Sequence, residues 1–96
     1  MEHEVEFEWN DAKAKMNLQN HGVSFDEAAS TFYDDNARPF QDIGHSDEEE
    51  RRRLIGMSNK SRVLLVVYTL RDVATIRIIS ARKVTLREQK AYGKED

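Results

Sequence analysis

The sequence predicts a small α+β domain, in which an antiparallel sheet carries helices on one face. The first observation is a set of three β-rich runs between residues 51 and 82, separated by short turn-like breaks, which is typical of a three-stranded meander. The second is a pair of helix start and stop signals in the first half of the chain. Because 96 residues suffice for one core, residues 1–96 are expected to form a single domain.

An N-terminal strand is predicted by three apolar residues that alternate with glutamates: Val5, Phe7 and Trp9. Asn10 or Asp11 then caps a helix that runs to about residue 20, and Gly22 ends it. A polar stripe follows that helix at i, i+4 and i+8: Lys13, Asn17 and His21. Most stripes of this kind are solvated faces, so a role in binding RNA or a partner protein is the alternative.

A second helix is predicted to begin at Ser24, which has the spacing of a capping box with Glu27. Its apolar positions recur at helical spacing and are expected to cover the core face of the sheet: Phe25, Ala28, Ala29 and Phe32. Residues 34–50 are predicted to form a long loop with a short extended piece near residues 37–41.

The meander is predicted to consist of three strands, at residues 52–57, 63–69 and 73–81. In the last strand Arg77 shares a face with Val73, Thr75 and Ile79, which leaves the core face to Ala74, Ile76, Ile78 and Ser80. The face of Arg77 must be at least partly open, because an unpaired guanidinium inside a core is costly. A capping box of Thr85 and Glu88 then starts a C-terminal helix.

The charge distribution is strongly asymmetric. Residues 1–50 carry 3 Lys and Arg against 14 Asp and Glu, whereas residues 51–96 carry 12 against 4. A basic half can form a nucleic-acid surface within a protein of net charge −3, although the acidic half or an acidic partner can equally cover it.

Several classes of protein are disfavoured by the composition. There are no cysteines, so disulfides and thiolate zinc sites are excluded, and three widely spaced histidines make a poor metal site. We therefore expect no metal, and the function considered below implies no organic cofactor. No apolar stretch reaches the roughly 20 residues of a membrane span, and the N-terminus is acidic, so we expect a cytoplasmic protein without membrane contact.

Three segments together resemble the BrnT toxins of bacterial type II BrnT/BrnA toxin–antitoxin modules: FEWNDAKAKMNLQNHGVSFDEAA, EERRRLIGMS and YTLRDVATIRIISARKVTLREQKAY. The resemblance extends from about Phe7 to Tyr92 and implies a RelE-like ribonuclease fold. It also implies RNA cleavage that inhibits translation and growth, a BrnA-type antitoxin bound in a higher-order complex, and contact with DNA only through that antitoxin. Asn10 and Asn20 depart from the aspartate and lysine that are common in the family.

Metal-independent RNA cleavage needs a base for the 2′-hydroxyl, a cation at the phosphorane and an acid for the 5′-oxygen. The resemblance assigns these tasks to His21, as acid or base, and to Arg77 and Arg82 of the RIISAR motif. Arg77 can instead pair with a carboxylate of the N-terminal half, and His21 can simply satisfy helix carbonyls. Arg82 can join Arg77 only if a bulge or the strand end re-aims it.

Four further residues are predicted to bind RNA: Lys13, Arg51, Trp9 and His45. For Trp9 a core position is the alternative, and for His45 it is a solvated loop. Two other functions compete with the ribonuclease: a non-catalytic RNA- or protein-binding module, and a decayed toxin that acts as co-repressor with its antitoxin.

Overall fold

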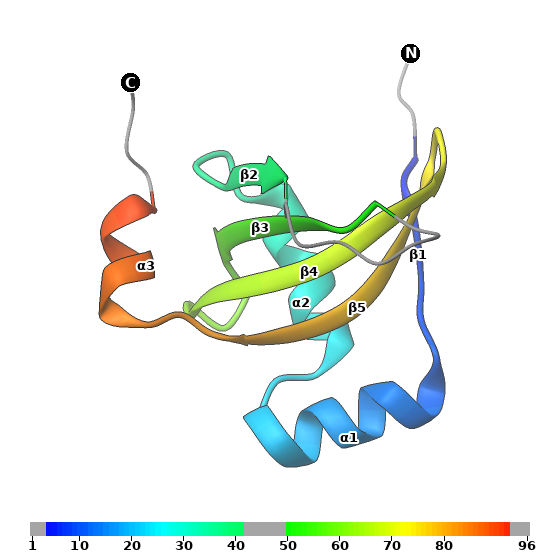
Figure 1. The fold of residues 1–96 in the computed structure, drawn as a ribbon, viewed down its shortest axis with the longest axis horizontal. Helices are drawn as coiled ribbons and strands as arrows, with labels where there is room; N and C mark the ends of the chain where they lie inside the picture. Colours follow the sequence, from blue (N-terminus) through cyan, green and yellow to red (C-terminus); the bar gives the residue numbers. More distant parts are fainter. Residues whose placement is uncertain (1–3, 42–49, 93–96) are drawn as a thin grey trace.

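The computed structural model describes residues 4–41 and 50–92, in which one five-stranded sheet has one helix behind it and two helices at its sides (Figure 1). The elements follow one another along the chain as β1 (Glu6–Glu8), α1 (Asp11–His21), α2 (Phe25–Ser30), a 3₁₀ turn (Thr31–Tyr33), β2 (Arg38–Gln41), β3 (Arg52–Met57), β4 (Val63–Asp72), β5 (Thr75–Lys83) and α3 (Leu86–Ala91). The α+β class and the short extended piece near residues 37–41 are therefore confirmed, the latter as β2. None of the described helices is long and apolar enough to cross a membrane.

The sheet has the strand order β1-β5-β4-β3-β2 and is mixed rather than antiparallel. The meander β3-β4-β5 is antiparallel as predicted, but β1 pairs with β5 in parallel, with Glu8 opposite Arg77. The prediction of an antiparallel N-terminal strand was wrong because alternation fixes only which side chains share a face. The direction of a strand depends on a partner far away in the sequence.

The β4–β5 hairpin turns two residues later than predicted. Strand β4 continues through Asp72, and the turn consists of Val73 and Ala74, with the Val73 side chain wholly exposed. The Asp72 carboxylate accepts a hydrogen bond of 2.9 Å from the Ala74 amide, which stabilises the turn without glycine. Val73 therefore belongs to no face of the sheet.

A bulge in the β4–β5 ladder changes which side chains share a face. Val67 pairs with Ser80, whereas the next residue, Tyr68, pairs with Ile78. Ile78 and Ala81 consequently both lie on the core face, and Arg77 and Arg82 both lie on the opposite face. The bulge that Arg82 needs in order to share a face with Arg77 is thus present. The prediction that Ser80 faces the core was wrong.

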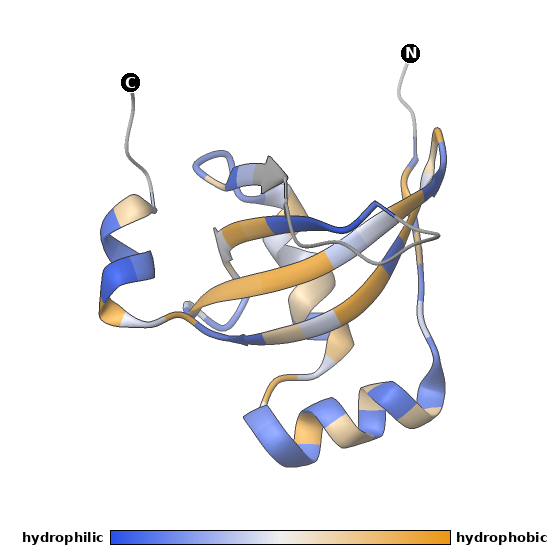
Figure 2. Ribbon diagram, in the orientation of Figure 1, coloured by the Kyte–Doolittle hydropathy of each residue, from blue (hydrophilic) through white to orange (hydrophobic). Residues whose placement is uncertain are grey.

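The core lies between α2 and one face of the sheet. Buried residues of the α2 segment pack on buried residues of the central strands: Val23, Phe25, Ala28, Leu54, Leu64, Val66, Tyr68, Ile78 and Ala81. Strand β4 supplies the longest hydrophobic stretch (Figure 2). Phe32 joins the two layers, since its ring centroid lies 5.4 Å from that of Phe7 and 4.9 Å from that of Tyr68.

The helix ends follow the capping signals of the sequence. Asn10 Oδ1 accepts from the Lys13 amide at 3.0 Å, and Gly22 ends α1 in a left-handed conformation with φ of 70°. Ser24 caps α2, but the Glu27 carboxylate does not return to Ser24 and bonds Arg62 and Ser58 instead. The predicted capping box is therefore complete only in α3.

Candidate RNA-binding face and active site

The face of the sheet opposite α2 carries arginines from four strands or their ends. Register places Arg38 beside Ile55, Arg53 beside Val67, and Arg77 beside Thr69. None of the described helices covers this face, which is at the front in Figure 1. We call it the arginine face and define it by Arg38, Arg51, Arg53, Arg71, Arg77 and Arg82.

The centre of the arginine face is apolar. Across the sheet, Arg38 is followed by Ile55, then Leu65, then Arg82. Ile55 and Leu65 are buried, with 1% and 4% of their surface exposed. The cations are therefore distributed around an apolar centre instead of forming one cluster.

At one end of this face, Glu8 lies between two arginines. Its Oε2 atom accepts from Nη1 of Arg77 at 2.9 Å and from Nη1 of Arg71 at 3.0 Å. The carboxylate partner from the N-terminal half, considered from the sequence as the alternative for Arg77, is thus found. One carboxylate thus faces two guanidiniums, and all three side chains are partly exposed, while Asp72 is a further anion close to Arg71.

Arg51 is near the same end. It directly precedes β3, in which Arg52 pairs with Tyr68. Extending this pairing by one residue puts Arg51 on one side of Thr69, and Arg77 lies on the other side. Its Nε atom is buried and has no hydrogen-bond partner among residues 4–41 and 50–92. A buried donor without a partner costs free energy, and an external acceptor can reach this Nε atom only if its surroundings rearrange.

At the other end, Arg82 is held by Glu88 of α3. Nη1 and Nη2 of Arg82 donate to the two carboxylate oxygens of Glu88, each at 2.9 Å, and Nη1 also donates to the Lys83 carbonyl at 3.1 Å. The hydrogen bonds from Arg82 lower the pKa of Glu88 to about 2. The same pair raises the pKa of Arg82, so both groups are charged at neutral pH.

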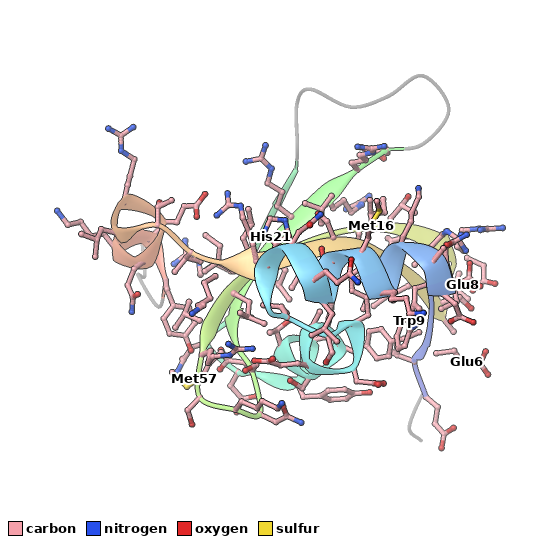
Figure 3. The ribbon with its side chains drawn as sticks, turned by 90° about the horizontal axis from the view of Figure 1, so that it is seen from below. Glu6, Glu8, Trp9, Met16, His21 and Met57 are labelled. Carbon is pink, nitrogen blue, oxygen red and sulfur yellow. The ribbon has the colours of Figure 1, made fainter. Side chains whose placement is uncertain are left out.

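His21 lies at the Arg82 end of the sheet. Helix α1 runs beside β5 in the same direction, with Glu8 near its start and His21 in its last turn (Figures 1 and 3). Asn17, one turn earlier on the same side of the helix, bonds the backbone of Ala81, the residue before Arg82. His21 is exposed, and its imidazole is therefore accessible to a substrate at this end.

Arg77 and Arg82 point the same way but do not converge. They are five residues apart on β5, which corresponds to roughly 15 Å along a strand. Their guanidiniums are also drawn apart, one toward Glu8 of β1 and the other toward Glu88 of α3. One phosphate cannot contact both in this arrangement.

The remaining predicted residues differ in their positions. Trp9 packs on the core, with its ring centroid 5.9 Å from that of Phe25, so it does not lie on the arginine face. Lys13 is exposed on the side of α1 that carries Asn17 and His21. His45 lies outside the described residues.

Besides Arg38 of β2, sequence reasoning missed four charged residues of the site: Glu8, Arg53, Arg71 and Glu88. A signal for Arg53 was present, because it lies two residues after Arg51 and must share its face. The other three depend on register or on contacts between distant segments. No three His, Asp or Glu side chains are grouped for a metal ion in residues 4–41 and 50–92.

The mixed five-stranded sheet and its arginine face define a small α+β protein with a cationic surface. The model of the family described as "Ribonuclease toxin, BrnT, of type II toxin-antitoxin system" matches residues 9–88. The chain therefore belongs to this family of ribonuclease toxins, which implies an antitoxin partner.

A comparison with solved structures agrees on the fold. The chain is similar to the crystal structure of the Brucella abortus ribonuclease toxin BrnT, with a TM-score of 0.62 and 19% sequence identity. The match covers 88% of this chain and 99% of the Brucella chain. A search of curated proteins found no match.

Proposed function

We propose that the protein is a RelE-like, metal-independent endoribonuclease in which the bond is broken at the Arg82 end of the arginine face. The observation that carries the proposal is the common location of His21 and Arg82 at that end. In the proposed reaction the 2′-oxygen attacks phosphorus and the 5′-oxygen leaves. His21 acts as acid or base for one of the two protons, and Arg82 stabilises the charge of the phosphorane.

Arg77 serves a different task in this proposal. It binds the RNA backbone at a neighbouring phosphate, together with Arg51, and Lys13 adds a further cation beside β5. The separation of roughly 15 Å along β5 supports two phosphate contacts rather than one clamp. The partial exposure of Arg51, directly before β3 and next to Thr69, supports its role as a donor to RNA.

In the cell, we propose that cleavage occurs in the cytoplasm and inhibits translation and growth. A BrnA-type antitoxin then silences the toxin in a higher-order complex, and DNA is contacted only through the antitoxin. The excess of positive charge on the arginine face supports the proposal that the antitoxin contacts this face through an acidic surface.

The test is cleavage of purified RNA by the isolated protein in EDTA, beside His21→Ala. The proposal predicts cleavage by the wild-type protein and a loss of about 100-fold or more in the variant. RNA binding without cleavage by the wild-type protein would contradict it and favour the non-catalytic binding module.

A further inference from the structure

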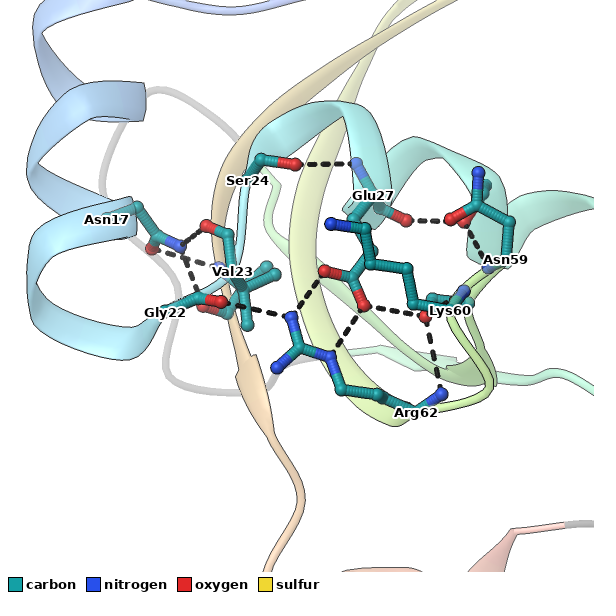
Figure 4. Close-up of polar contacts among 11 residues, drawn as sticks. Asn17, Gly22, Val23, Ser24, Glu27, Asn59, Lys60 and Arg62 are labelled. Carbon is teal, nitrogen blue, oxygen red and sulfur yellow. Dashed lines mark hydrogen bonds and ion pairs between the residues drawn. The ribbon is translucent and has the colours of Figure 1, made fainter.

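The side chain of Asn17 is a buried polar group on a helix that is otherwise mostly exposed. Only 7% of its surface is accessible. Its Nδ2 donates to the carbonyls of Val23 at 2.9 Å and Ala81 at 2.8 Å, and its Oδ1 accepts from the Ala81 amide at 3.2 Å. The amide therefore joins α1, the turn that follows it and β5 (Figure 4).

On β5, Asn17 takes the place of a strand partner. Strand β1 ends at Glu8, opposite Arg77, so it does not pair with the later part of β5. The side-chain amide of Asn17 donates to and accepts from the backbone of Ala81, as a residue of a neighbouring strand would. The position of Arg82, the next residue, is thereby fixed relative to α1.

The turn after His21 is held by side chains as well. The Gly22 carbonyl accepts from Nη2 of Arg62 at 3.0 Å, and the Val23 carbonyl accepts from Asn17 (Figure 4). Arg62 is itself oriented by two hydrogen bonds to the buried carboxylate of Glu27. Hydrogen bonds from Arg62 lower the pKa of Glu27, although burial opposes this, so the pair is ionised at neutral pH.

We infer that Asn17 is a positioning residue that holds His21 in register with Arg82. The inference rests on the proposed function, because it explains how the two residues of the proposed active site keep their relative positions. Asn17 bonds the residue before Arg82 and lies one helical turn before His21. Without the amide, α1 is expected to shift along β5, and a shift of about 1 Å can reduce a reaction rate about 100-fold.

The test compares Asn17→Ala with Gln19→Ala, which removes an exposed amide from the same helix. RNA cleavage is measured at saturating RNA and at a temperature where both variants are folded. We expect kcat to fall about 100-fold in Asn17→Ala with little change in RNA affinity, and neither to change in Gln19→Ala. Amide hydrogen exchange at Ala81 should accelerate only in Asn17→Ala. An unchanged kcat in folded Asn17→Ala would overturn the inference.

A double-mutant cycle separates this inference from the proposed function. If His21→Ala alone lowers kcat and Asn17→Ala adds nothing in that background, Asn17 acts through His21 as inferred. An equal further loss in both backgrounds overturns the positioning role while leaving the proposed function intact. Full activity of His21→Ala overturns both.

A second variant covers the case in which Asn17→Ala does not fold. Arg62→Lys keeps a cation beside Glu27 but lacks the planar fork that also reaches the Gly22 carbonyl. We expect a smaller loss of kcat, about tenfold, again with unchanged RNA affinity. If Arg62→Lys slows folding but leaves kcat at the wild-type value, the inference is contradicted.

Discussion

The two ends of the arginine face contain the same residue type on the same strand, yet they offer different chemistry. Arg77 and Arg82 are comparably accessible, with 31% and 37% of their side chains exposed, and each bonds a carboxylate. Of the three histidines, His21 is the one within residues 4–41 and 50–92, and it lies at the Arg82 end. In the proposed function, this proton carrier, rather than the arginine itself, distinguishes the end that cleaves RNA from the end that binds it.

Glu88 and Glu8 also differ in how much of the paired guanidinium they leave available to a phosphate. Glu88 occupies both terminal amino groups of Arg82, so the Nε edge of that guanidinium remains for a phosphate oxygen. Glu8 is shared between Arg71 and Arg77 on an exposed edge, where ion pairs contribute little to stability. RNA phosphate can replace such a weak partner at small cost.

The largest expected effect is that of Arg82→Ala on the rate of cleavage. Removing a cation from a developing phosphorane charge typically costs about 10²–10³-fold in kcat. We expect that loss at saturating RNA, with KM changed by only a few-fold. Steady-state kinetics over a range of RNA concentrations measures both. A raised KM with unchanged kcat would show that Arg82 does not act on the reacting phosphate.

The next largest effect is that of Arg77→Ala, and it should appear in affinity. Loss of one phosphate contact on a single strand lowers the slope of log Kd against log salt by about 0.7. We expect Kd to rise about tenfold at low salt while kcat stays within a few-fold of the wild-type value. Fluorescence anisotropy at several salt concentrations, with a non-cleavable RNA, checks this. A loss confined to kcat would show that Arg77 stabilises the phosphorane instead of binding a neighbouring phosphate.

Glu88→Gln should change the pH dependence of stability. The Glu88 pKa of about 2 in the folded protein lies below the value of about 4.3 in an unfolded chain. The pair therefore stabilises the fold above about pH 4.3, and this contribution, on the order of 1 kcal/mol, is lost as the pH falls toward 2.

Urea unfolding between pH 2 and pH 6 measures this effect. Glutamine retains the helix cap but not the charge, so the variant should lose less stability on acidification than the wild-type protein. Parallel curves for the two proteins would mean that the Arg82–Glu88 pair contributes nothing to the fold.

The smallest effect is expected for Glu8→Gln, as an increase in RNA affinity of about two- to threefold at low salt. Removing the carboxylate leaves Arg71 and Arg77 without the anion that competes with phosphate. Glu6→Gln is the matched control, because it removes the same charge from an exposed residue of β1. An equal gain in the control would show that the change in RNA affinity comes from the overall charge of the protein and not from the contact of Glu8 with Arg71 and Arg77.

The parts of the fold that follow local rules were predictable, and those that depend on distant partners were not. Asn10, Ser24 and Thr85 cap their helices as their spacing indicated, because capping involves neighbouring residues. The parallel direction of β1 and the turn at residues 73–74 were missed, since both are fixed by strand pairing.

The same division applies to the site. Motifs pointed to His21, Arg77 and Arg82, and the need for a bulge was deduced from alternation. Periodicity could not reveal that Asn17 is buried against β5, because a polar residue in a polar stripe resembles a solvated one. Nor could it separate the ends of the arginine face, which only the register of β5 and its partners distinguishes.

The most direct test is a pair of double-mutant cycles of kcat in EDTA, one joining His21→Ala with Arg82→Ala and the other joining His21→Ala with Arg77→Ala. Residues that act on one reacting phosphate are strongly non-additive, whereas distant ones are additive. We predict that His21 and Arg82 are coupled, so that the double variant is little worse than the poorer single variant. We predict that the effects of His21→Ala and Arg77→Ala are additive. Coupling of His21 with Arg77 and additivity with Arg82 would contradict the account.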